Sequence, residues 1–192
     1  MMRLLEVPVR TIRTAALAVL VVFGLGFGLT VHSVAADAAV PQVGEKAPAF
    51  ALPSQDSPSI SLDSFRGKWV VLYFYPKDMS QGCTIEAHNF QQDMGQYDAL
   101  NAVIVGVSVD SADSHKEFCA KEGLHFKLLS DQDKKVSAEY GSLSDHNGMQ
   151  MSTRNTFLID PQGKIVKVWT AVNPNAHSQE VLAALRGFES KS

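Results

Sequence analysis

The sequence predicts an α/β fold in which helices cover both faces of a central sheet. Segments typical of strands and of helices alternate along the chain from Trp69 onward. The two longest strand candidates, residues 69–75 and 103–109, are apolar almost throughout, as strands in the middle of a sheet are. A hairpin and an amphipathic helix at 176–188 close the pattern.

The composition describes one globular domain of ordinary size. The chain has 192 residues, of which 45% are hydrophobic and 19% are charged, so it can bury a substantial core. The formal net charge of −3 gives no basis for a nucleic-acid partner. Two cysteines are too few for a disulfide scaffold, and the sequence has no CxxC motif or Cys/His cluster typical of zinc sites.

The N-terminal segment has the order of a secretory signal. Arg3, Arg10 and Arg13 precede an apolar run at 15–31, and small residues follow it. We therefore expect residues 1–38 to be a signal peptide, or else an N-terminal membrane anchor, and residues 39–192 to be the folded domain. Either outcome places the domain outside the cytoplasm, in the periplasm or alternatively in a thylakoid lumen, where disulfides persist.

The first half of the domain is predicted as a hairpin, a strand and a long helix. Short apolar runs at 49–52 and 60–62 are separated by a polar turn, which is typical of a hairpin. The strand at 69–75 ends at Pro76, and a helix then runs from Cys83 to about Leu100. Apolar residues recur along this helix at spacings of three and four: Ala87, Phe90, Met94, Tyr97 and Leu100.

The second half continues with a central strand at 103–109. Asp113 or Ser114 is expected to cap the next helix, which ends near Gly123. The remaining predicted elements are a strand at 126–129, a short helix at 134–140, a polar loop at 142–152, strands at 155–159 and 165–169 joined by a tight turn, and the helix at 176–188.

Cys83 is the residue best placed for chemistry. It follows the small polar loop Ser80-Gln81-Gly82 at the end of a central strand, where crevices open in α/β sheets. In the first turn of a helix, unpaired backbone N–H groups and the helix dipole stabilise a thiolate. The alternative is a buried cysteine that acts as a small hydrophobic residue. We predict that Cys83 is the nucleophile.

The stretch YFYPKDMSQGCTIEAHNF resembles the active-site segment of the peroxiredoxins, in particular the peroxiredoxin Q (bacterioferritin comigratory protein) subfamily. The family pattern of Pro, three residues, Thr or Ser, two residues and Cys is present as Pro76, Ser80 and Cys83. The segments GEKAPAFALPSQD, LLSDQDKKVSAEYG and RNTFLIDPQGKIVKVW extend the similarity from Val43 to near the C-terminus. The resemblance implies a thioredoxin-like fold with a central mixed sheet, and thiol-dependent reduction of hydrogen peroxide and organic hydroperoxides.

The resemblance also implies a role for each matching residue. Cys83 would be the peroxidatic cysteine, Ser80 would bond the thiolate and peroxide through its hydroxyl, and Pro76 would shield the thiolate from water. Arg154 would stabilise the thiolate and polarise the peroxide, and Glu86 would support the site from the next turn. The alternatives are a surface charge at a strand edge for Arg154 and a helix-surface carboxylate for Glu86.

The second cysteine determines the subclass. Many relatives place a resolving cysteine five residues after the peroxidatic one, where this chain has His88. The resemblance then implies that Cys119 resolves the reaction through an intramolecular disulfide with Cys83, although Cys119 beside Phe118 could instead be a core residue. It further implies a monomer that is recycled by a thioredoxin-like or other dithiol protein and needs no cofactor or metal.

Other signals are weaker. We expect the remaining histidines of the domain to be solvated surface residues, and Met149 and Met151 to be loop residues rather than copper ligands. Those histidines are His88, His115, His125, His146 and His177.

Three other functions compete with the peroxidase. A thioredoxin-like disulfide reductase would need a CxxC motif, but Ser80 stands at its first cysteine. A periplasmic copper chaperone of this fold would use CxxxC, and Ala87 stands at its second cysteine. The third alternative is a binding module without catalytic activity.

Overall fold

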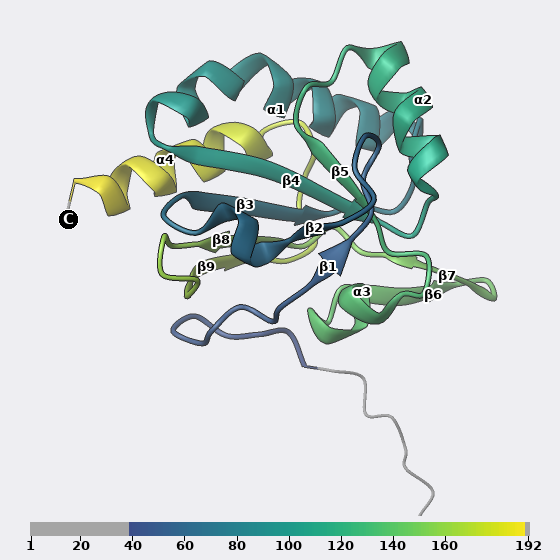
Figure 1. Ribbon diagram of the computed structural model, residues 1–192, viewed down its shortest axis with the longest axis horizontal. Helices are drawn as coiled ribbons and strands as arrows, with labels where there is room; N and C mark the ends of the chain where they lie inside the picture. Colours follow the sequence, from purple (N-terminus) through teal and green to yellow (C-terminus); the bar gives the residue numbers. More distant parts are fainter. Residues whose placement is uncertain (1–38, 191–192) are drawn as a thin grey trace, which may run out of the picture. The chain divides into compact units, whose positions relative to one another are not determined.

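A computed structural model describes residues 39–190, which form a five-stranded mixed sheet with helices on both faces (Figure 1). The strand order is β5–β4–β3–β8–β9. Its members are β3 (Trp69–Phe74), β4 (Ala102–Ser108), β5 (Lys127–Ser130), β8 (Thr156–Ile159) and β9 (Ile165–Trp169). The predicted signal or anchor segment, residues 1–38, lies outside the described residues. No helix within residues 39–190 has the length and apolar character to cross a membrane.

Strand direction brings distant parts of the chain to one edge of the sheet. β3 pairs with β4 in parallel and with β8 in antiparallel orientation. The last pair of the β3–β8 ladder joins Tyr73 to Thr156, so the end of β3 lies beside the beginning of β8. Consequently the loop that leads to Cys83 and the segment that carries Arg154 meet at this edge.

Three helices cover one face of the sheet: α1 (Gln81–Ala99), α2 (Ala112–Glu122) and α4 (His177–Glu189). Figure 1 shows α1 and α4 next to one another on this face. Alternate residues of β3, among them Val71 and Tyr73, point into the same core as the buried stripe of α1. Ala87, Phe90 and Tyr97 of that stripe are buried, as predicted.

The opposite face is covered by the short helix α3 (Lys135–Glu139), the segment before β3 and the 3-10 helix η1 (Leu62–Phe65). Its core contains the other residues of β3, such as Leu72 and Phe74, with Tyr140 and Phe157. The predicted N-terminal hairpin is confirmed as β1 (Ala51–Leu52) paired with β2 (Ile60–Ser61).

The predicted polar loop at 142–152 was wrong. This segment forms a hairpin of β6 (Leu143–His146) and β7 (Met149–Ser152). Asn147 and Gly148 have φ of 56° and 82°, as the tight turn between two paired strands requires. Asn-Gly is a strong hairpin signal, but the mixed polar and methionine flanks concealed it.

Two helix starts also differ from expectation. α1 begins at Gln81, with Ser80 as the residue before its first turn, so Cys83 is the third helical residue. The N-cap of α2 is Ser111, whose hydroxyl oxygen accepts a hydrogen bond from the Ser114 amide; Asp113 and Ser114 lie inside the helix. Serine is a favoured N-cap because its oxygen satisfies an otherwise unpaired amide.

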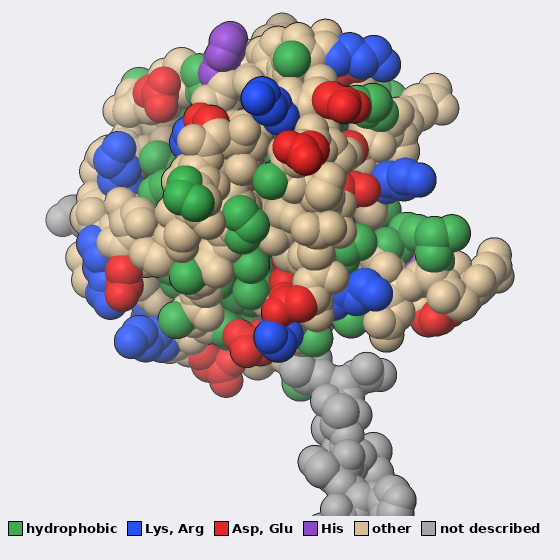
Figure 2. All heavy atoms as spheres, turned by 45° about the vertical axis from the view of Figure 1, so that its right-hand side comes forward, with side chains coloured by type: hydrophobic (Ala, Val, Ile, Leu, Met, Phe, Trp, Pro, Cys, Tyr) green, Lys and Arg blue, Asp and Glu red, His purple; other side chains and the backbone are tan. Residues whose placement is uncertain are grey.

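The surface shown in Figure 2 carries acidic and basic side chains near one another. This face therefore presents no basic stripe of the kind that binds the phosphates of nucleic acids.

Candidate active site

Cys83 lies at the N-terminal end of α1, directly after the loop that leaves β3. Its side chain is a free thiol with 1% of the residue exposed, packed in the core beneath α1. The backbone N–H groups of the first turn of α1 have no partner within the helix, and they lie at the same N-terminal end as Cys83. A negative charge on the sulfur is thus placed where helix geometry stabilises it.

Arg154 joins Cys83 to Glu86. Its Nη2 donates to the Cys83 sulfur at 3.3 Å, and its Nη1 donates to Glu86 Oε2 at 2.6 Å. One planar guanidinium reaches both groups because residues three apart lie on the same face of a helix. The Arg154 side chain is 20% exposed and that of Glu86 is 1% exposed. The surface alternatives considered for these two residues were therefore wrong.

The cost of burying the Glu86 carboxylate is only partly offset by its partner. Burial raises its pKa to about 7, and the attraction of the Arg154 guanidinium offsets only part of this effect. The second oxygen, Oε1, has no hydrogen-bond partner among residues 39–190. Below this pKa, a proton on Oε1 can neutralise the carboxyl while Oε2 keeps its bond to Arg154.

Gly82 makes room for the guanidinium. A Cβ atom at this position would lie 2.7 Å from Arg154 Nη2, well inside van der Waals contact. On its other side Arg154 is fixed through its backbone, because its carbonyl accepts from the Val172 amide at 3.0 Å. The glycine before Cys83 thus controls how closely the cation approaches the sulfur.

Ser80 and Pro76 line the approach to the helix, and both are partly buried. The Ser80 hydroxyl donates to the Lys77 carbonyl at 3.0 Å rather than to the Cys83 sulfur. Because serine lacks the methyl group of threonine, its χ1 rotamer is less restricted, and the hydroxyl can leave the Lys77 carbonyl and turn toward a ligand. The roles of both residues toward the peroxide stay predictions.

Cys119 lies in α2, in the same core cluster as Cys83 and beside Phe118. Burial raises the pKa of its thiol to about 11, and the nearby Asp78 and Asp56 carboxylates add to the effect. In this conformation Cys119 has the surroundings of a core cysteine, which is the alternative to a resolving role. Its resolving role stays a prediction.

Tyr73 lies in the same core cluster as the two cysteines. Burial raises the pKa of its phenol far above the ordinary value, and negative charge at Glu86, Cys83 or Cys119 would raise it further. Its ring packs over Gly106 of β4, where a Cβ would come within 2.8 Å of the Tyr73 hydroxyl. Tyr73 therefore shares one core cluster with both cysteines, and Gly106 gives its ring space.

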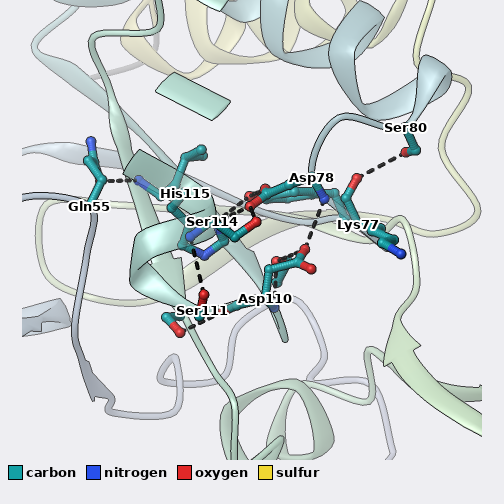
Figure 3. Close-up of polar contacts among 12 residues, drawn as sticks. Gln55, Lys77, Asp78, Ser80, Asp110, Ser111, Ser114 and His115 are labelled. Carbon is teal, nitrogen blue, oxygen red and sulfur yellow. Dashed lines mark hydrogen bonds and ion pairs between the residues drawn. The ribbon is translucent and has the colours of Figure 1, made fainter. Parts of the chain in front are cut away.

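The structure adds a polar network that the sequence did not indicate (Figure 3). Asp78, 6% exposed, accepts hydrogen bonds from the Tyr75 hydroxyl at 2.7 Å and the Ser114 hydroxyl at 2.7 Å. It also pairs with His115 Nδ1 at 2.8 Å. Burial alone would raise the pKa of Asp78, but the hydrogen bonds from His115, Ser114 and Tyr75 lower it below the ordinary value. We call Asp78, Tyr75, Ser114 and His115 the Asp78 hub.

Two histidines are buried, contrary to prediction. His115 belongs to the Asp78 hub, and His177 packs between Phe90 and Trp169 with Nε2 at 2.8 Å from Thr156 Oγ1. Burial lowers the pKa of His177 to about 4. Their flanking residues are polar in sequence, and only the packing of helices on the sheet encloses them. Within residues 39–190, no group of three or more His, Cys, Asp or Glu is arranged to hold a metal ion.

Comparisons with known proteins agree on one family. The AhpC/TSA family model matches residues 43–168. Peroxiredoxin Bcp of Bacillus subtilis is 38% identical over 154 residues, which cover 78% of this chain and 98% of the relative. The crystal structure of a cysteine mutant of Xylella fastidiosa PrxQ superposes with a TM-score of 0.75 at 32% identity, covering 79% of this chain and 99% of the other.

A second solved structure bears on substrates. It is the bacterioferritin comigratory protein of Xanthomonas campestris, studied for its alkyl peroxide reduction activity in trapped intermediate and ligand complexes. It matches with a TM-score of 0.70 at 35% identity over 79% of this chain and 99% of that chain. These relatives share the thioredoxin-like fold predicted for this sequence.

Proposed function

Since this chain belongs to the AhpC/TSA family, with the peroxiredoxins Bcp and Q, and is a thiol-dependent peroxidase, we propose that it uses an atypical two-cysteine cycle. In this cycle Cys83 reacts with the peroxide and Cys119 resolves the product as an intramolecular disulfide. The observation that carries the assignment of Cys83 is the Arg154 guanidinium, 3.3 Å from its sulfur and held there by Glu86.

The first step is attack of the Cys83 thiolate on the terminal oxygen of ROOH. The new S–O bond forms as the O–O bond breaks; the sulfur is oxidised to sulfenic acid, and the departing alkoxide takes a proton and leaves as ROH. Arg154 stabilises the thiolate before the attack and the developing negative charge on the peroxide oxygens during it. Ser80, after rotation from the Lys77 carbonyl, supplies a further hydrogen bond to the peroxide, and Pro76 keeps water from the sulfur.

The second step joins the two cysteines. Cys119, as thiolate, attacks the sulfur of the Cys83 sulfenic acid; the S–S bond forms, and hydroxide leaves and is protonated to water. Burial holds the pKa of Cys119 at about 11, so few of these thiols are ionised while α2 is intact. Unwinding of the helix around Cys119 exposes the thiol, restores its ordinary pKa and thereby activates it.

The substrates are peroxides, and a thiol compound returns the enzyme to the reduced state. We propose hydrogen peroxide and alkyl hydroperoxides as substrates, the latter supported by the activity named for the Xanthomonas campestris relative. A thioredoxin-like dithiol protein would reduce the disulfide in two exchange steps and become a disulfide itself. We further propose that the protein is exported, because residues 1–38 have the order of a secretory signal. That it is a monomer is proposed from its resemblance to peroxiredoxin Q alone.

Mass spectrometry of the exported protein before and after one equivalent of peroxide tests this cycle. The wild-type chain should form a disulfide between Cys83 and Cys119, and the mass of the untreated protein reports its N-terminus. Cys83→Ser should abolish peroxide consumption. Cys119→Ser should perform one turnover and then accumulate Cys83 sulfenic or sulfinic acid. A fully oxidised wild-type monomer that retains a free Cys119 would refute the two-cysteine cycle.

A further inference from the structure

The Asp78 hub connects the two chain segments that must rearrange for disulfide formation. Asp78 precedes Cys83 by five residues, and His115 precedes Cys119 by four. Its carboxylate bonds Ser114 and His115 in the first turn of α2 from the loop that leads into α1. The hub is thus a non-covalent crosslink between the same two segments that the disulfide would join (Figure 3).

The hub is anchored at the ends of three neighbouring strands. The Asp78 amide donates to Asp110 Oδ2 at 2.9 Å, and the Ser108 hydroxyl at the end of β4 donates to the same oxygen at 2.8 Å. The Ser130 hydroxyl at the end of β5 donates to the Asp110 carbonyl at 2.6 Å. Tyr75, which bonds the Asp78 carboxylate, follows the last residue of β3. Opening the hub would leave a buried carboxylate without its donors, which is costly.

The cysteines lie beyond this anchored region. Cys83 is in the first turn of α1 and Cys119 in the second half of α2, each on a separate element. A disulfide needs its two Cα atoms about 4.4–6.8 Å apart with suitable Cβ directions. Because both thiols are free and each is held within a regular helix, we expect the helix around one or both cysteines to unwind before they bond. Helix ends open at lower free energy than the strands on which they pack.

From this arrangement we propose that the Asp78 hub stays closed during the reaction and is the hinge about which the two cysteine segments unwind. Asp78 is then a positioning residue for disulfide closure, an inference that rests on the proposed two-cysteine cycle. With the hub closed, the loop that the disulfide closes spans about nine residues, five from Asp78 to Cys83 and four from His115 to Cys119. Without the hub, the last pair of the β3–β4 ladder, Phe74 with Val107, still joins the two segments, and the loop spans 21 residues, nine on the Cys83 side and 12 on the Cys119 side. Because closure probability falls as the 3/2 power of loop length, the hub raises the effective concentration of the two sulfurs about three- to fourfold.

Rapid-quench measurement of the two chemical steps tests the hinge. Asp78→Asn preserves size but removes the charge that holds His115 and Ser114. We expect sulfenic acid formation at the wild-type rate and disulfide closure about three- to fourfold slower, with more Cys83 sulfinic acid at a given peroxide dose. Asp93→Asn is the matched control, because Asp93 in α1 is 8% exposed and bonds Ser178 and Gln179 rather than α2. It should close at the wild-type rate.

Hydrogen exchange of the wild-type protein gives a second readout that a general loss of stability does not mimic. In the disulfide form, amides around Cys83 and Cys119 should lose protection relative to the reduced form. The amides of Asp78 and His115, which donate to Asp110 Oδ2 and the Ser111 carbonyl, should keep it. If Asp78→Asn does not fold, Ser114→Ala removes one donor from the partly exposed first turn of α2 and should slow closure in the same direction.

The outcomes separate the hinge from the cycle on which it rests. Closure at the wild-type rate or faster in Asp78→Asn would identify the hub as irrelevant or as a latch that opposes unwinding, and would overturn the hinge alone. Equal slowing by Asp93→Asn, or loss of protection at Asp78 and His115 on oxidation, would overturn it as well. A wild-type chain that never forms the Cys83–Cys119 disulfide would refute both proposals.

Discussion

Replacing Glu86 by glutamine should change how the stability of the reduced enzyme depends on pH. In the folded protein burial raises the pKa of Glu86 to about 7, against an ordinary value of 4.5. The folded state therefore holds a proton on this carboxyl that the unfolded chain has released. A glutamine side chain would keep a hydrogen-bond acceptor for Arg154, but its amide does not gain or lose a proton in this pH range.

The sign and size follow from proton linkage. A group whose folded pKa is raised contributes its full stability below the unfolded pKa and loses it as pH rises through the folded pKa. For Glu86 this loss of stability falls between pH 4.5 and 7. The pKa difference between the unfolded and folded states is roughly 2.5, and at about 1.4 kcal/mol for each pKa unit it amounts to about 3 kcal/mol of unfolding free energy. Relative to wild type, Glu86→Gln should therefore gain about 3 kcal/mol of unfolding free energy between about pH 4.5 and pH 7.5.

Urea unfolding of both reduced proteins across this range measures the difference, and other titrating groups cancel in the comparison. His177→Asn provides a control of opposite sign. Burial lowers the pKa of His177 to about 4 from 6.5, so its contribution is present above pH 6.5 and lost as pH falls toward 4. In the wild type the two slopes oppose one another. A difference between wild type and Glu86→Gln that stays constant across this pH range would refute a buried, neutral Glu86.

Three further predictions concern the sulfur atoms and their cation. Gly82→Ala should slow peroxide reduction about tenfold, because its Cβ displaces the Arg154 guanidinium. The control Gly95→Ala places its Cβ more than 4 Å from any described atom beyond the adjoining residues of its own helix, so it should keep the wild-type rate and gain up to about 1 kcal/mol of stability. Arg154→Lys should lower the rate constant for peroxide about a hundredfold in stopped-flow assays, since an ammonium cannot fork between Cys83 and Glu86; a rate within about twofold of wild type would contradict the fork. In the Cys83→Ser background, Cys119 should react with iodoacetamide at about pH 8 roughly a hundredfold more slowly than an exposed cysteine, because its pKa is about 11; equal rates would show that the thiol is not buried.

Much of the fold could be predicted because local pattern and packing agree. The apolar strand at 69–75 is the centre of the sheet, and the stripe that includes Phe90 and Tyr97 faces the core as its spacing required. The end of a central strand also located the site, since that is where Cys83 and Arg154 meet. The family resemblance supplied Arg154 itself, which nothing in its own neighbourhood of sequence distinguishes.

Contacts between distant segments are what the sequence could not provide. His115 and His177 sit among polar neighbours, yet tertiary packing buries both. Asp78 lies in a loop and finds its partners 36 and 37 residues away, in a helix whose relation to that loop depends on the complete sheet. The hairpin around Asn147 is a different case, because its turn signal was present and was outweighed by its flanks.

The antiparallel pairing of β8 with β3 makes reactivity a marker of completed folding. Arg154 follows Cys83 by 71 residues and reaches it only when β8 docks beside β3. A chain that is still being synthesised therefore carries Cys83 as a thiol without its cation. Such a chain meets peroxide with the slow chemistry of an unassisted cysteine, and it avoids oxidation of Cys83 before the domain has folded.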